Sequence, residues 1–496
     1  MSRLDRGIVV ACVSLAAVAG NSIVWGSSPA AVHVALRRSE PKANDTLNTA
    51  PRSIRLDFTQ AIEIRLARVT LVRANSVAIQ LGPPRAADST NRAFVTDVLS
   101  PLGGGSYRVT WSVTSRDSHT IRGEIPFTVL AAAVDTVPTA PSARAAADTV
   151  DSAAASSPAA PQDNEFDARS PSYVAIRWLS FVGMLGVIGA LFFGAAVLRT
   201  VTAADSAPDA ARAAAIRRAF AAARTGAIGG ATILLGAAAL RLFAQVRTVS
   251  GEASFDPAVM SALLGGTAWG WGWLVQLAAA VFAIGVATLG MRRPGTTAGW
   301  SAAEILTGPI VVALGVSAAV SGHPIAATPA GVAIAADAAH LIAAGGWIGT
   351  LGYVAFAAIP ATAALGPDGR PRLVRDIVAT FSRLALIFAS IVVVTGLASS
   401  WIQVQAVAPL WTTLYGRVLL IKLALVVAVG AAGAYNWRVA TPRLLEAGGV
   451  ARIRLVMLTE LAFAILVLAV TSVLVATPPP GEAMDAATAT TEASPR

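Results

Sequence analysis

The sequence predicts two structural classes in one chain: an all-β, immunoglobulin-like Greek-key sandwich tethered to an all-α bundle of eight transmembrane helices. Three observations lead to this prediction. Residues 33–130 alternate between apolar and polar side chains, residues 131–171 contain almost no large apolar side chains, and the chain from Tyr173 onward consists of long apolar stretches. Apolar residues make up 55% of the chain and charged residues only 13%, which argues against an ordinary soluble enzyme.

The first 32 residues have the features of a secretory signal peptide. Arg3 and Arg6 precede an apolar stretch at residues 8–20, and small residues surround Ala30. The one cysteine of the chain, Cys12, lies in this segment, so the sequence excludes an intrachain disulfide framework and a cysteine-based zinc or iron–sulfur site. We therefore expect the residues that follow to be exported.

Residues 33–130 predict the β-sandwich, because short segments with period-2 alternation are separated by turn residues. Thr and Arg occupy the outward positions of these segments, and three glycines at 103–105 separate two of them. Trp111 shares a face with Val109 and Val113, so we expect its side chain in the core. The expected antiparallel strands are 54–58, 67–72, 94–98, 107–113 and 125–129.

Two segments have compositions that cannot bury a core. Residues 131–171 consist mainly of Ala, Pro, Ser, Thr and Asp, which predicts a disordered linker. A linker of this length spans on the order of 30–40 Å between its ends, so it leaves the β domain free to dock. Residues 478–496 predict a disordered tail.

The segment 172–477 predicts the membrane domain. Its apolar stretches are each close to the ~20 residues that a helix needs to cross a bilayer. The expected spans are 173–198, 222–245, 269–290, 303–321, 331–361, 379–402, 415–437 and 455–476.

The distribution of arginine predicts the orientation of these helices. The chain has 36 Arg and two Lys, and its net charge is +10. If the β domain is exported, the loops 199–221, 291–302, 362–378 and 438–454 lie in the cytoplasm; they carry 13 arginines, whereas the outer loops carry only Arg247. We therefore expect a multi-pass protein of the bacterial inner membrane with both termini on the periplasmic side. The lipid bilayer explains the basic surplus, and no nucleic-acid partner is needed.

Polar residues inside the apolar stretches are candidates for function, because burying them in a membrane is expensive. Asp337 and His340 are three residues apart in the fifth stretch and share a helical face with Trp347. The carboxylate can hydrogen-bond one imidazole nitrogen and leave the other for a metal ion or a proton. A hydrogen bond that only holds two helices together is the competing interpretation.

Three further residues extend this candidate path. His323 lies at the outer mouth between the fourth and fifth stretches. Lys422 lies about a third of the way into the seventh stretch and needs Asp337, Glu460 or water as a partner. For Lys422 a role in an ion path and a role in packing are equally compatible with the sequence, and Glu460 is interpreted as a packing or interfacial residue.

The exported domain carries a candidate metal site. Asp117 and His119 are two residues apart, so in an extended segment their side chains point the same way. His33 falls at or near the N-terminus that signal cleavage would create. A free amine with two imidazoles and a carboxylate is a nitrogen and oxygen donor set suited to Cu(II).

These motifs resemble a known family. The segments 33–36, 39–41, 51–58, 107–111 and 115–119, with Gly123 and Phe127, are similar to the periplasmic copper-binding protein CopC. The helical part resembles the membrane partner CopD at Gly322, His323, Asp337, His340, Trp347, Gly349, Phe381, Arg383, Thr395, Gly396, Tyr415, Arg417, Lys422 and Asn436. The resemblance covers residues 33–130 and 173–476.

The resemblance implies a CopC–CopD fusion that handles copper. It implies that His33, Asp117 and His119 bind Cu(II) in the β domain, and that the helical domain moves copper across the inner membrane. Some CopC proteins also have a Met-rich Cu(I) site, but residues 33–130 contain no Met, so we expect no such site here. The family arrangement requires cleavage directly before His33, whereas cleavage after Ala30 fits the small-residue preference better.

The sequence thus predicts a non-enzymatic, inner-membrane copper-handling protein, with copper ions and periplasmic copper carriers as partners. We expect His323, Asp337, His340 and Lys422 to form the membrane copper path. A copper-sequestering or sensing module with the helices as an anchor is the main alternative. A haem-binding membrane oxidoreductase is a distant alternative, because only one histidine lies clearly inside the membrane.

Overall fold

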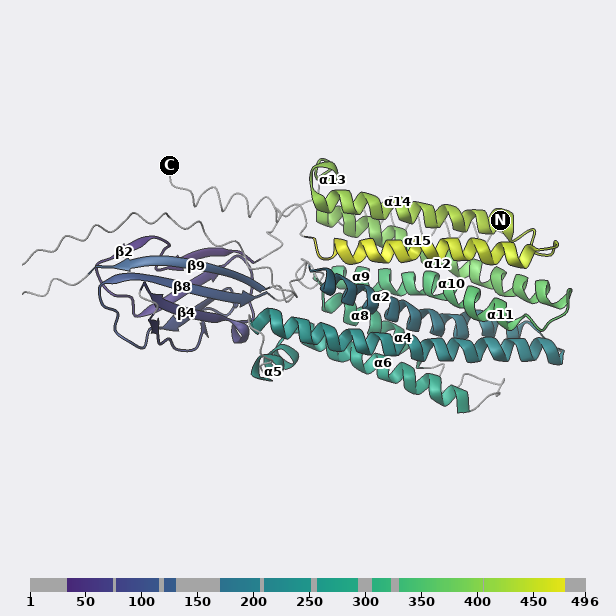
Figure 1. The fold of residues 1–496 in the computed structure, drawn as a ribbon, viewed down its shortest axis with the longest axis horizontal. Coiled ribbons are helices and arrows are strands. Elements are labelled where there is room, and N and C mark those ends of the chain that lie inside the picture. The colour runs from purple at the N-terminus through teal and green to yellow at the C-terminus, as the bar shows by residue number, and fades with distance from the viewer. Residues whose placement is uncertain are drawn as a thin grey trace, which may run out of the picture. The chain divides into compact units, whose positions relative to one another are not determined.

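The structure, a computed structural model, describes residues 34–74, 77–115, 120–130, 170–205, 209–250, 257–292, 306–322, 330–404 and 406–477. These residues divide into two compact units. The β unit comprises the described residues between 34 and 130, drawn in purple and blue in Figure 1, and the helical unit comprises those from 171 to 477, drawn in teal to yellow. Each unit has hydrophobic clusters of its own.

The β unit is a sandwich of two sheets. One sheet has the strand order β1 (Leu36–Glu40), β3 (Ser53–Phe58), β7 (Ala93–Asp97) and β6 (Arg85–Ala86). The other has the order β2 (Asp45–Leu47), β9 (Thr120–Val129), β8 (Gly105–Thr114), β4 (Arg68–Arg73) and β5 (Ala78–Ile79). A short 3-10 helix, η1 (Ile64–Leu66), precedes β4.

The core of the β unit forms between the inner faces of the two sheets, as the alternation in the sequence predicts. On β8 the buried positions are every second residue, and Trp111 is 6% exposed between the fully buried Val109 and Val113. The Trp111 ring packs edge-on against Phe58 of the other sheet, with ring centroids 5.4 Å apart. The prediction that Trp111 is a core residue is therefore confirmed.

All five predicted strands are present as β3, β4, β7, β8 and β9. The four strands that the sequence did not predict are between two and five residues long, too short to carry a readable alternation. The expectation of purely antiparallel pairing is wrong at one place, because β2 pairs with β9 in parallel.

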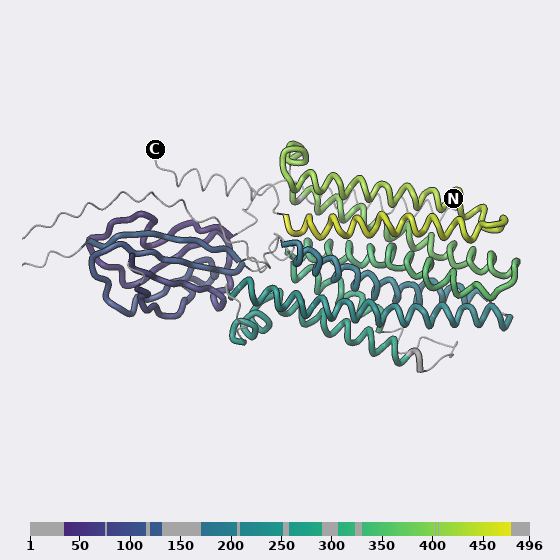
Figure 2. The backbone as a smooth tube through the Cα atoms, viewed as in Figure 1, coloured from purple at the N-terminus to yellow at the C-terminus, as the bar shows by residue number. Residues whose placement is uncertain are grey.

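The helical unit is built from long helices that run side by side (Figure 2). Several of them contain π-helical segments, here η2, η4, η5 and η6. In chain order the elements are α2 (Pro171–Phe192), η2 (Phe193–Leu198), α3 (Arg199–Ala203), α4 (Ala210–Ser250), α5 (Pro257–Gly266), α6 (Ala268–Arg292), α8 (Thr307–Val320), α9 (Ala330–Ala344), η4 (Gly345–Gly349), α10 (Thr350–Tyr353), η5 (Val354–Ala358), α11 (Ile359–Ala361), α12 (Gly369–Val404), α13 (Pro409–Thr412), α14 (Leu414–Tyr435), η6 (Asn436–Ala440) and α15 (Gly449–Leu474).

Seven helical segments of the described chain are long and apolar enough to cross a membrane. They are Pro171–Ala203, Ala210–Ser250, Ala268–Leu289, Ala330–Ala361, Gly369–Trp401, Leu414–Ala440 and Gly449–Leu474. They correspond to seven of the eight predicted spans. The predicted span 303–321 contains α8, an apolar helix of 14 residues that is shorter than a bilayer crossing requires. The predicted count of eight is therefore approximate.

Two helices extend beyond their predicted spans. α4 has 41 residues and α12 has 36, so Arg212, Arg217 and Arg218 lie on a helix and not in the loop predicted at 199–221. The apolar window marks only the part of a helix that fits the bilayer, and the charged first turns of α4 and α12 lie outside that window.

The predicted span 331–361 is not one regular α-helix. Its α-helical spacing ends at Ala344, where the π-helical η4 begins. Because a π-helix closes its hydrogen bonds at i+5, the argument that placed Trp347 on the face of His340 does not extend past Ala344. Trp347 packs instead against the hydrophobic cluster around Leu351 and Phe381.

Candidate functional site

The residues predicted to bind Cu(II), namely His33, Asp117 and His119, lie outside the described residues. The structure does describe the residues next to them in the sequence. Val34 follows His33, and Ser115 and Thr120 flank the segment that contains Asp117 and His119. The hydrogen bonds of these neighbours define one edge of the β unit.

Residues 59–63, here called the edge segment, bind the beginning of the described chain. The backbone N–H of Ala35 donates to Thr59 Oγ1 at 2.9 Å, and the backbone N–H of Thr59 donates to the Ala35 carbonyl at 2.9 Å. Val34 is 5% exposed and packs into the sandwich core. Ala35 is therefore bound to the edge segment by two hydrogen bonds, and Val34, the residue next to His33, is held by burial.

The same edge segment binds the end of β8. Ile62 forms an isolated antiparallel bridge with Ser115, and the backbone N–H of Glu63 donates to the Thr114 carbonyl at 2.8 Å. Thr114 pairs with Thr120 across the β8–β9 hairpin, and their hydroxyl oxygens are 3.3 Å apart. Thr59 and Ile62 are three residues apart, so their separation is at most about 10 Å. The two chain ends that lead to the predicted ligands are thus held on one short segment.

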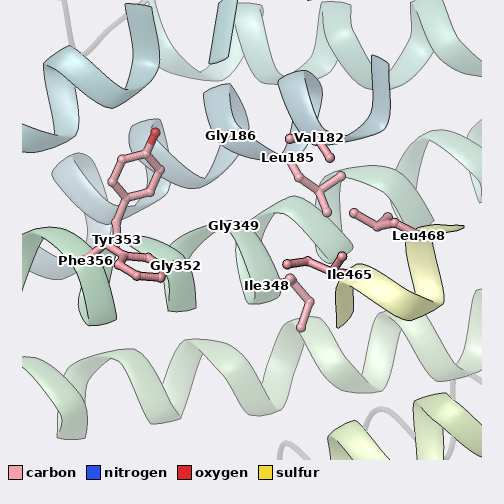
Figure 3. A pocket seen from close by; sticks show the side chains of 10 residues that line it. All are labelled: Val182, Leu185, Gly186, Ile348, Gly349, Gly352, Tyr353, Phe356, Ile465 and Leu468. Atoms are coloured by element: carbon pink, nitrogen blue, oxygen red, sulfur yellow. The ribbon is translucent and has the colours of Figure 1, made fainter. Parts of the chain in front are cut away.

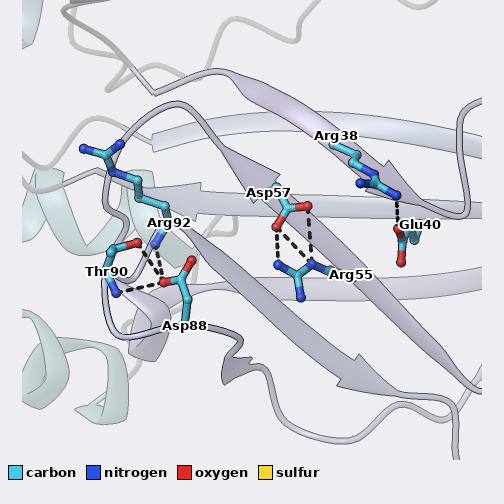
Figure 4. Close-up of polar contacts among 7 residues, drawn as sticks. All are labelled: Arg38, Glu40, Arg55, Asp57, Asp88, Thr90 and Arg92. Carbon is cyan, nitrogen blue, oxygen red and sulfur yellow. Dashed lines mark hydrogen bonds and ion pairs between the residues drawn. The ribbon is translucent and has the colours of Figure 1, made fainter.

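A turn at Asp88 supports the edge segment from the other side. The Asp88 carboxylate accepts hydrogen bonds from the Thr90 hydroxyl at 2.8 Å, the Thr90 backbone N–H at 2.9 Å and the Arg92 backbone N–H at 3.3 Å (Figure 4). These bonds lower the pKa of Asp88 below its ordinary value of 3.8. Between the two donors, the Asn91 carbonyl accepts from the backbone N–H of Ile62 at 2.8 Å.

Other carboxylates of the β unit are engaged in ion pairs. Asp57 accepts from Arg55, with Nη2 of Arg55 2.9 Å from Oδ1 of Asp57, and the hydrogen bonds raise the pKa of Arg55 (Figure 4). Glu40 is paired with Arg38. These carboxylates satisfy arginines on the sheet surface, so they are poor candidates for metal ligands.

In the helical unit, three of the four predicted path residues are described, and they lie on α9 and α14. We call Asp337 and His340 of α9, Thr395 of α12 and Lys422 of α14 the intramembrane cluster. His340 Nδ1 lies 2.8 Å from Thr395 Oγ1, a contact that joins α9 to α12. A Cβ atom on Gly396 would lie 3.3 Å from His340 Cε1, so the small glycine next to Thr395 leaves room for the imidazole.

The hydroxyl of Thr395 determines which imidazole nitrogen remains available. Thr395 Oγ1 lies 2.6 Å from the Ile391 carbonyl oxygen and donates its single hydrogen there. It then accepts from the Nδ1–H of His340, a tautomer assigned from the hydrogen-bond network. Nε2 of His340 keeps its lone pair and can bind a metal ion or a proton.

The predicted hydrogen bond between Asp337 and His340 is wrong, because Thr395 takes the place of the carboxylate. Asp337 interacts electrostatically with Lys422 of α14. Among the described residues, no hydrogen bond and no ion pair within 4.0 Å involves either Asp337 or Lys422. Asp337, His340 and Lys422 are all half-buried. The two groups of opposite charge, Asp337 and Lys422, therefore interact inside the helical unit without a direct contact.

His323, the predicted residue at the outer mouth, lies outside the described residues. The chain two residues before it is held by Arg241 of α4, whose Nη2 donates to the Ser321 carbonyl at 3.0 Å. The Arg241 guanidinium also lies over the Trp269 ring, 5.4 Å from its centroid.

The sequence assigned no role to two of the groups found here. Thr395 is part of the resemblance to CopD, but nothing in the sequence shows that it faces a histidine 55 residues away. Asn436 donates from Nδ2 to Glu460 Oε1 at 3.1 Å. Glu460 is 2% exposed, which agrees with the interpretation of this residue as a packing residue.

The helical unit also contains an apolar pocket of about 270 Å³ between α2, the η4–α10–η5 region and α15. Three of its lining residues are glycines, Gly186, Gly349 and Gly352, and Tyr353 is the one with a polar side chain (Figure 3). The pocket offers no nitrogen or sulfur ligand, so we do not assign it to the copper path.

Over the described residues, no group of three or more His, Cys, Asp or Glu side chains is placed so that it could hold a metal ion. The predicted triad of His33, Asp117 and His119 lies outside that set, and the intramembrane cluster contributes one His and one Asp.

Three family profiles match the chain. They are the CopC domain at residues 36–130, the Copper resistance protein D-like, N-terminal domain at residues 167–333, and Copper resistance protein D at residues 375–474. Thr395 and Lys422 fall within the last match. Asp337 and His340 lie between the two membrane-domain matches.

Similar proteins have names that refer to copper. The chain is 23% identical over 419 residues to the Copper transport protein CutJ of Bacillus subtilis (strain 168), covering 82% of this chain and 68% of that protein. It is 30% identical over 108 residues to Copper resistance protein C of Xanthomonas campestris pv. juglandis, covering 21% of this chain and 84% of that protein. Among solved structures, PcoC, a methionine-rich copper resistance protein from Escherichia coli, is 28% identical, with a TM-score of 0.18, 20% of this chain covered and 98% of that one.

Proposed function

The chain belongs to the CopC family and carries a CopC domain fused to a CopD-like membrane domain, and from this premise we propose that it captures Cu(II) with the β unit and moves copper across the bacterial inner membrane with the helical unit. The family names point to copper resistance or transport, which is a non-enzymatic role. In this proposal copper is the cargo of the protein.

The hydrogen bonding of the edge segment is the observation that carries the Cu(II) half of the proposal. Ala35 and Ser115 are both bound to residues 59–63, so His33 on one side and Asp117 with His119 on the other start from anchored neighbours. Imidazole, amine and carboxylate ligands suit Cu(II), which binds N/O sites more tightly than the other divalent metals of the first row. Anchored neighbours reduce the conformational entropy that the ligands lose on binding.

The free Nε2 of His340 supports the transport half of the proposal. Nε2 of His340 and the carboxylate of Asp337 are the candidate copper ligands of the intramembrane cluster. Without cargo, the ammonium group of Lys422 balances the charge of Asp337 through their electrostatic interaction. An arriving copper ion competes with Lys422 for the Asp337 carboxylate, and the charges stay compensated when Lys422 gives up its proton as copper binds.

The arginine distribution supports the orientation that this route requires, with the β unit on the periplasmic side. We propose that residues 1–32 are a signal peptide and that residues 131–171 tether the β unit to the membrane domain, with residues 478–496 as a periplasmic tail. A tether makes the transfer intramolecular, which raises the effective copper concentration at the membrane entrance near His323. Periplasmic copper carriers are the proposed source of the ion.

Copper binding by the purified full-length protein tests the Cu(II) half. Electron paramagnetic resonance should show one Cu(II) with nitrogen ligands, and His119→Ala should weaken binding by a factor of roughly 10–100 or more. The matched control is Glu124→Gln, which changes an exposed carboxylate on the same strand β9 and should leave both spectrum and affinity unchanged.

Two results would contradict the proposed site. One is a His119→Ala protein with the same spectrum and affinity as the wild type. The other is a mature chain that begins at Ala31, because the N-terminal amine would then be two residues away from His33. Determination of the N-terminal sequence of the exported protein decides the second point.

A further inference from the structure

Glu460 is a carboxylic acid in the interior of the helical unit. It lies 11 residues after the start of α15, which places it about 16 Å along a helix that crosses the membrane, close to its midpoint. Its exposure is 2%, and a Cβ atom on Gly433 of α14 would lie 3.6 Å from Oε2. The side chain is therefore enclosed between α14 and α15.

Asn436 is the polar partner of this carboxyl group. Its Nδ2 donates to Glu460 Oε1 at 3.1 Å, whereas its Oδ1 is buried and has no hydrogen-bond partner in the described structure. Asn436 begins the π-helical segment η6, where its carbonyl accepts from the Thr441 backbone N–H at 2.8 Å. Single-turn π-helical insertions occur frequently at functional sites, because they re-aim a side chain within a helix.

Among the residues that the structure describes, no cationic side chain is ion-paired with the carboxyl group. The elements packed against α15 carry titratable or charged side chains at Tyr173 and Arg177 of α2, Tyr353 of α10, Arg370, Arg372, Arg375, Asp376 and Arg383 of α12, Tyr415, Arg417, Lys422 and Tyr435 of α14, and Arg438 of η6. Within the described part of the chain, none of these side chains is hydrogen-bonded or ion-paired to Glu460, whose interaction is with Asn436 alone.

An ionised carboxylate in this position is unfavourable, because it loses its hydration and gains only one amide hydrogen bond. A proton on Oε2 removes the charge and also supplies the donor that Asn436 Oδ1 lacks. In a closed pair of the planar acid and the planar amide, the amide N–H would donate to Oε1 and the acid O–H would donate to Oδ1. One proton satisfies both groups.

We propose that Glu460 and Asn436 form a proton-binding site in the membrane domain, and that this site holds its proton at neutral pH. The site is separate from the proposed copper path, since Asn436 lies 14 residues, or about 21 Å, from Lys422 along the same helical segment. The pair offers no nitrogen or sulfur lone pair, so it is a poorer copper site than one with imidazole, but its oxygens can accept a proton or a hard cation. A proton is favoured over a hard cation, because it supplies the hydrogen-bond donor that Asn436 Oδ1 lacks.

Infrared spectroscopy of the full-length protein in lipid nanodiscs tests the proposal. The wild type should show the C=O stretch of a protonated carboxylic acid at neutral pH, with a shift in heavy water. The band should be absent from Glu460→Gln, which keeps the shape of the side chain and can still pair with the amide of Asn436. In Asn436→Ala the band should move to higher frequency, because the acid loses its hydrogen-bond partner.

The control is Glu446→Gln, which changes an exposed glutamate of the same unit that is ion-paired with Arg452. Its spectrum should keep the protonated band and lose only carboxylate absorption. If the difference between wild type and Glu460→Gln contains carboxylate bands alone, or depends on sodium, the proposal is wrong. If Glu460→Gln does not fold, an unshifted band in Asn436→Ala contradicts the proposal.

Discussion

The hydrogen bond between His340 and Thr395 decides which imidazole nitrogen can meet a cation in the membrane domain. Because Thr395 donates its hydrogen to the Ile391 carbonyl, it can only accept from His340. The ring is then fixed in one tautomer and one orientation, as metal-binding histidines generally are. The hydroxyl group of Thr395 on α12 thus orients the imidazole of His340 on α9.

At the same scale, the turn of Asp88 predicts a pH dependence of the edge segment. The pKa of Asp88 is lower in the folded state than its ordinary value of 3.8, so its contribution is complete above that value and is lost as the pH falls through the folded-state pKa. At neutral pH we expect the amide hydrogens of Thr90 and Arg92 to exchange faster in Asp88→Ala than in the wild type. At a pH where Asp88 is protonated, the two proteins should exchange these hydrogens at the same rate. Hydrogen exchange followed by mass spectrometry measures both rates.

The control for this prediction is Asp88→Asn, which keeps an acceptor oxygen but cannot titrate. Its protection of the turn should not change across the acid range, apart from the intrinsic pH dependence of exchange. Equal exchange rates of the wild type and Asp88→Ala at neutral pH would show that the turn does not depend on the carboxylate.

The sequence predicted residue types better than residue pairs. His340 and Asp337 were predictable as functional candidates because polar side chains are rare in apolar stretches. Lys422 was among the partners that the sequence offered for Asp337, whereas the partner of His340 was not predictable, because the choice between Thr395 and Asp337 depends on the rotation of α9 against α12, and helix rotation is set by packing. The same holds for Glu460, whose partner Asn436 is 24 residues away on another helix.

At the scale of elements, the crossing of α2 with η4 is set by glycine. A Cβ atom on Gly349 would lie 2.2 Å from the Leu185 carbonyl oxygen, and one on Gly189 would lie 2.3 Å from the backbone of Gly349. Contacts this short between backbones are possible only without side chains, as at other close helix crossings in membranes. The segment η4 begins directly after α9, the helix that carries His340, so the crossing fixes the end of that helix against α2.

We therefore expect Gly349→Ala to destabilise the helical unit by about 1–3 kcal/mol or more, because the neighbouring backbone must move. The matched control is Gly229→Ala in α4, where a Cβ atom would meet nothing within 4 Å. That variant should be neutral or more stable by about 0.5–1 kcal/mol, because alanine favours the helix. Thermal unfolding of the two purified variants, followed by helical ellipticity, gives the comparison; a Gly349→Ala protein as stable as Gly229→Ala would contradict it.

The elements that the sequence predicted are those with a long, regular pattern. The five alternating strands and seven apolar helices were predictable because periodicity and span length leave a direct trace. Strands such as β5 and β6, with two residues each, leave none. The π-helical η4 was also missed, since an apolar run gives the same signal whether its hydrogen bonds close at i+4 or i+5.

At the scale of the whole molecule, the chain joins a β-sandwich with a CopC domain to a helical unit whose long apolar helices are able to cross a membrane. The low charge content, the Ala- and Pro-rich segment 131–171 and the arginine bias predicted this division from the sequence. The fold of each unit agrees with it, and the family profiles cover both units. The remaining question is whether copper passes from one unit through the other.

Copper uptake into vesicles that contain the full-length protein tests this passage most directly. The wild type should carry copper faster than protein-free vesicles, and His340→Ala should reduce uptake to the protein-free rate. Thr395→Val, which removes the hydroxyl that orients His340, should lower uptake by a factor of roughly 10–100, whereas Thr395→Ser should retain it. Wild-type uptake no faster than that of protein-free vesicles, or unchanged uptake by folded His340→Ala, would contradict transport through the intramembrane cluster.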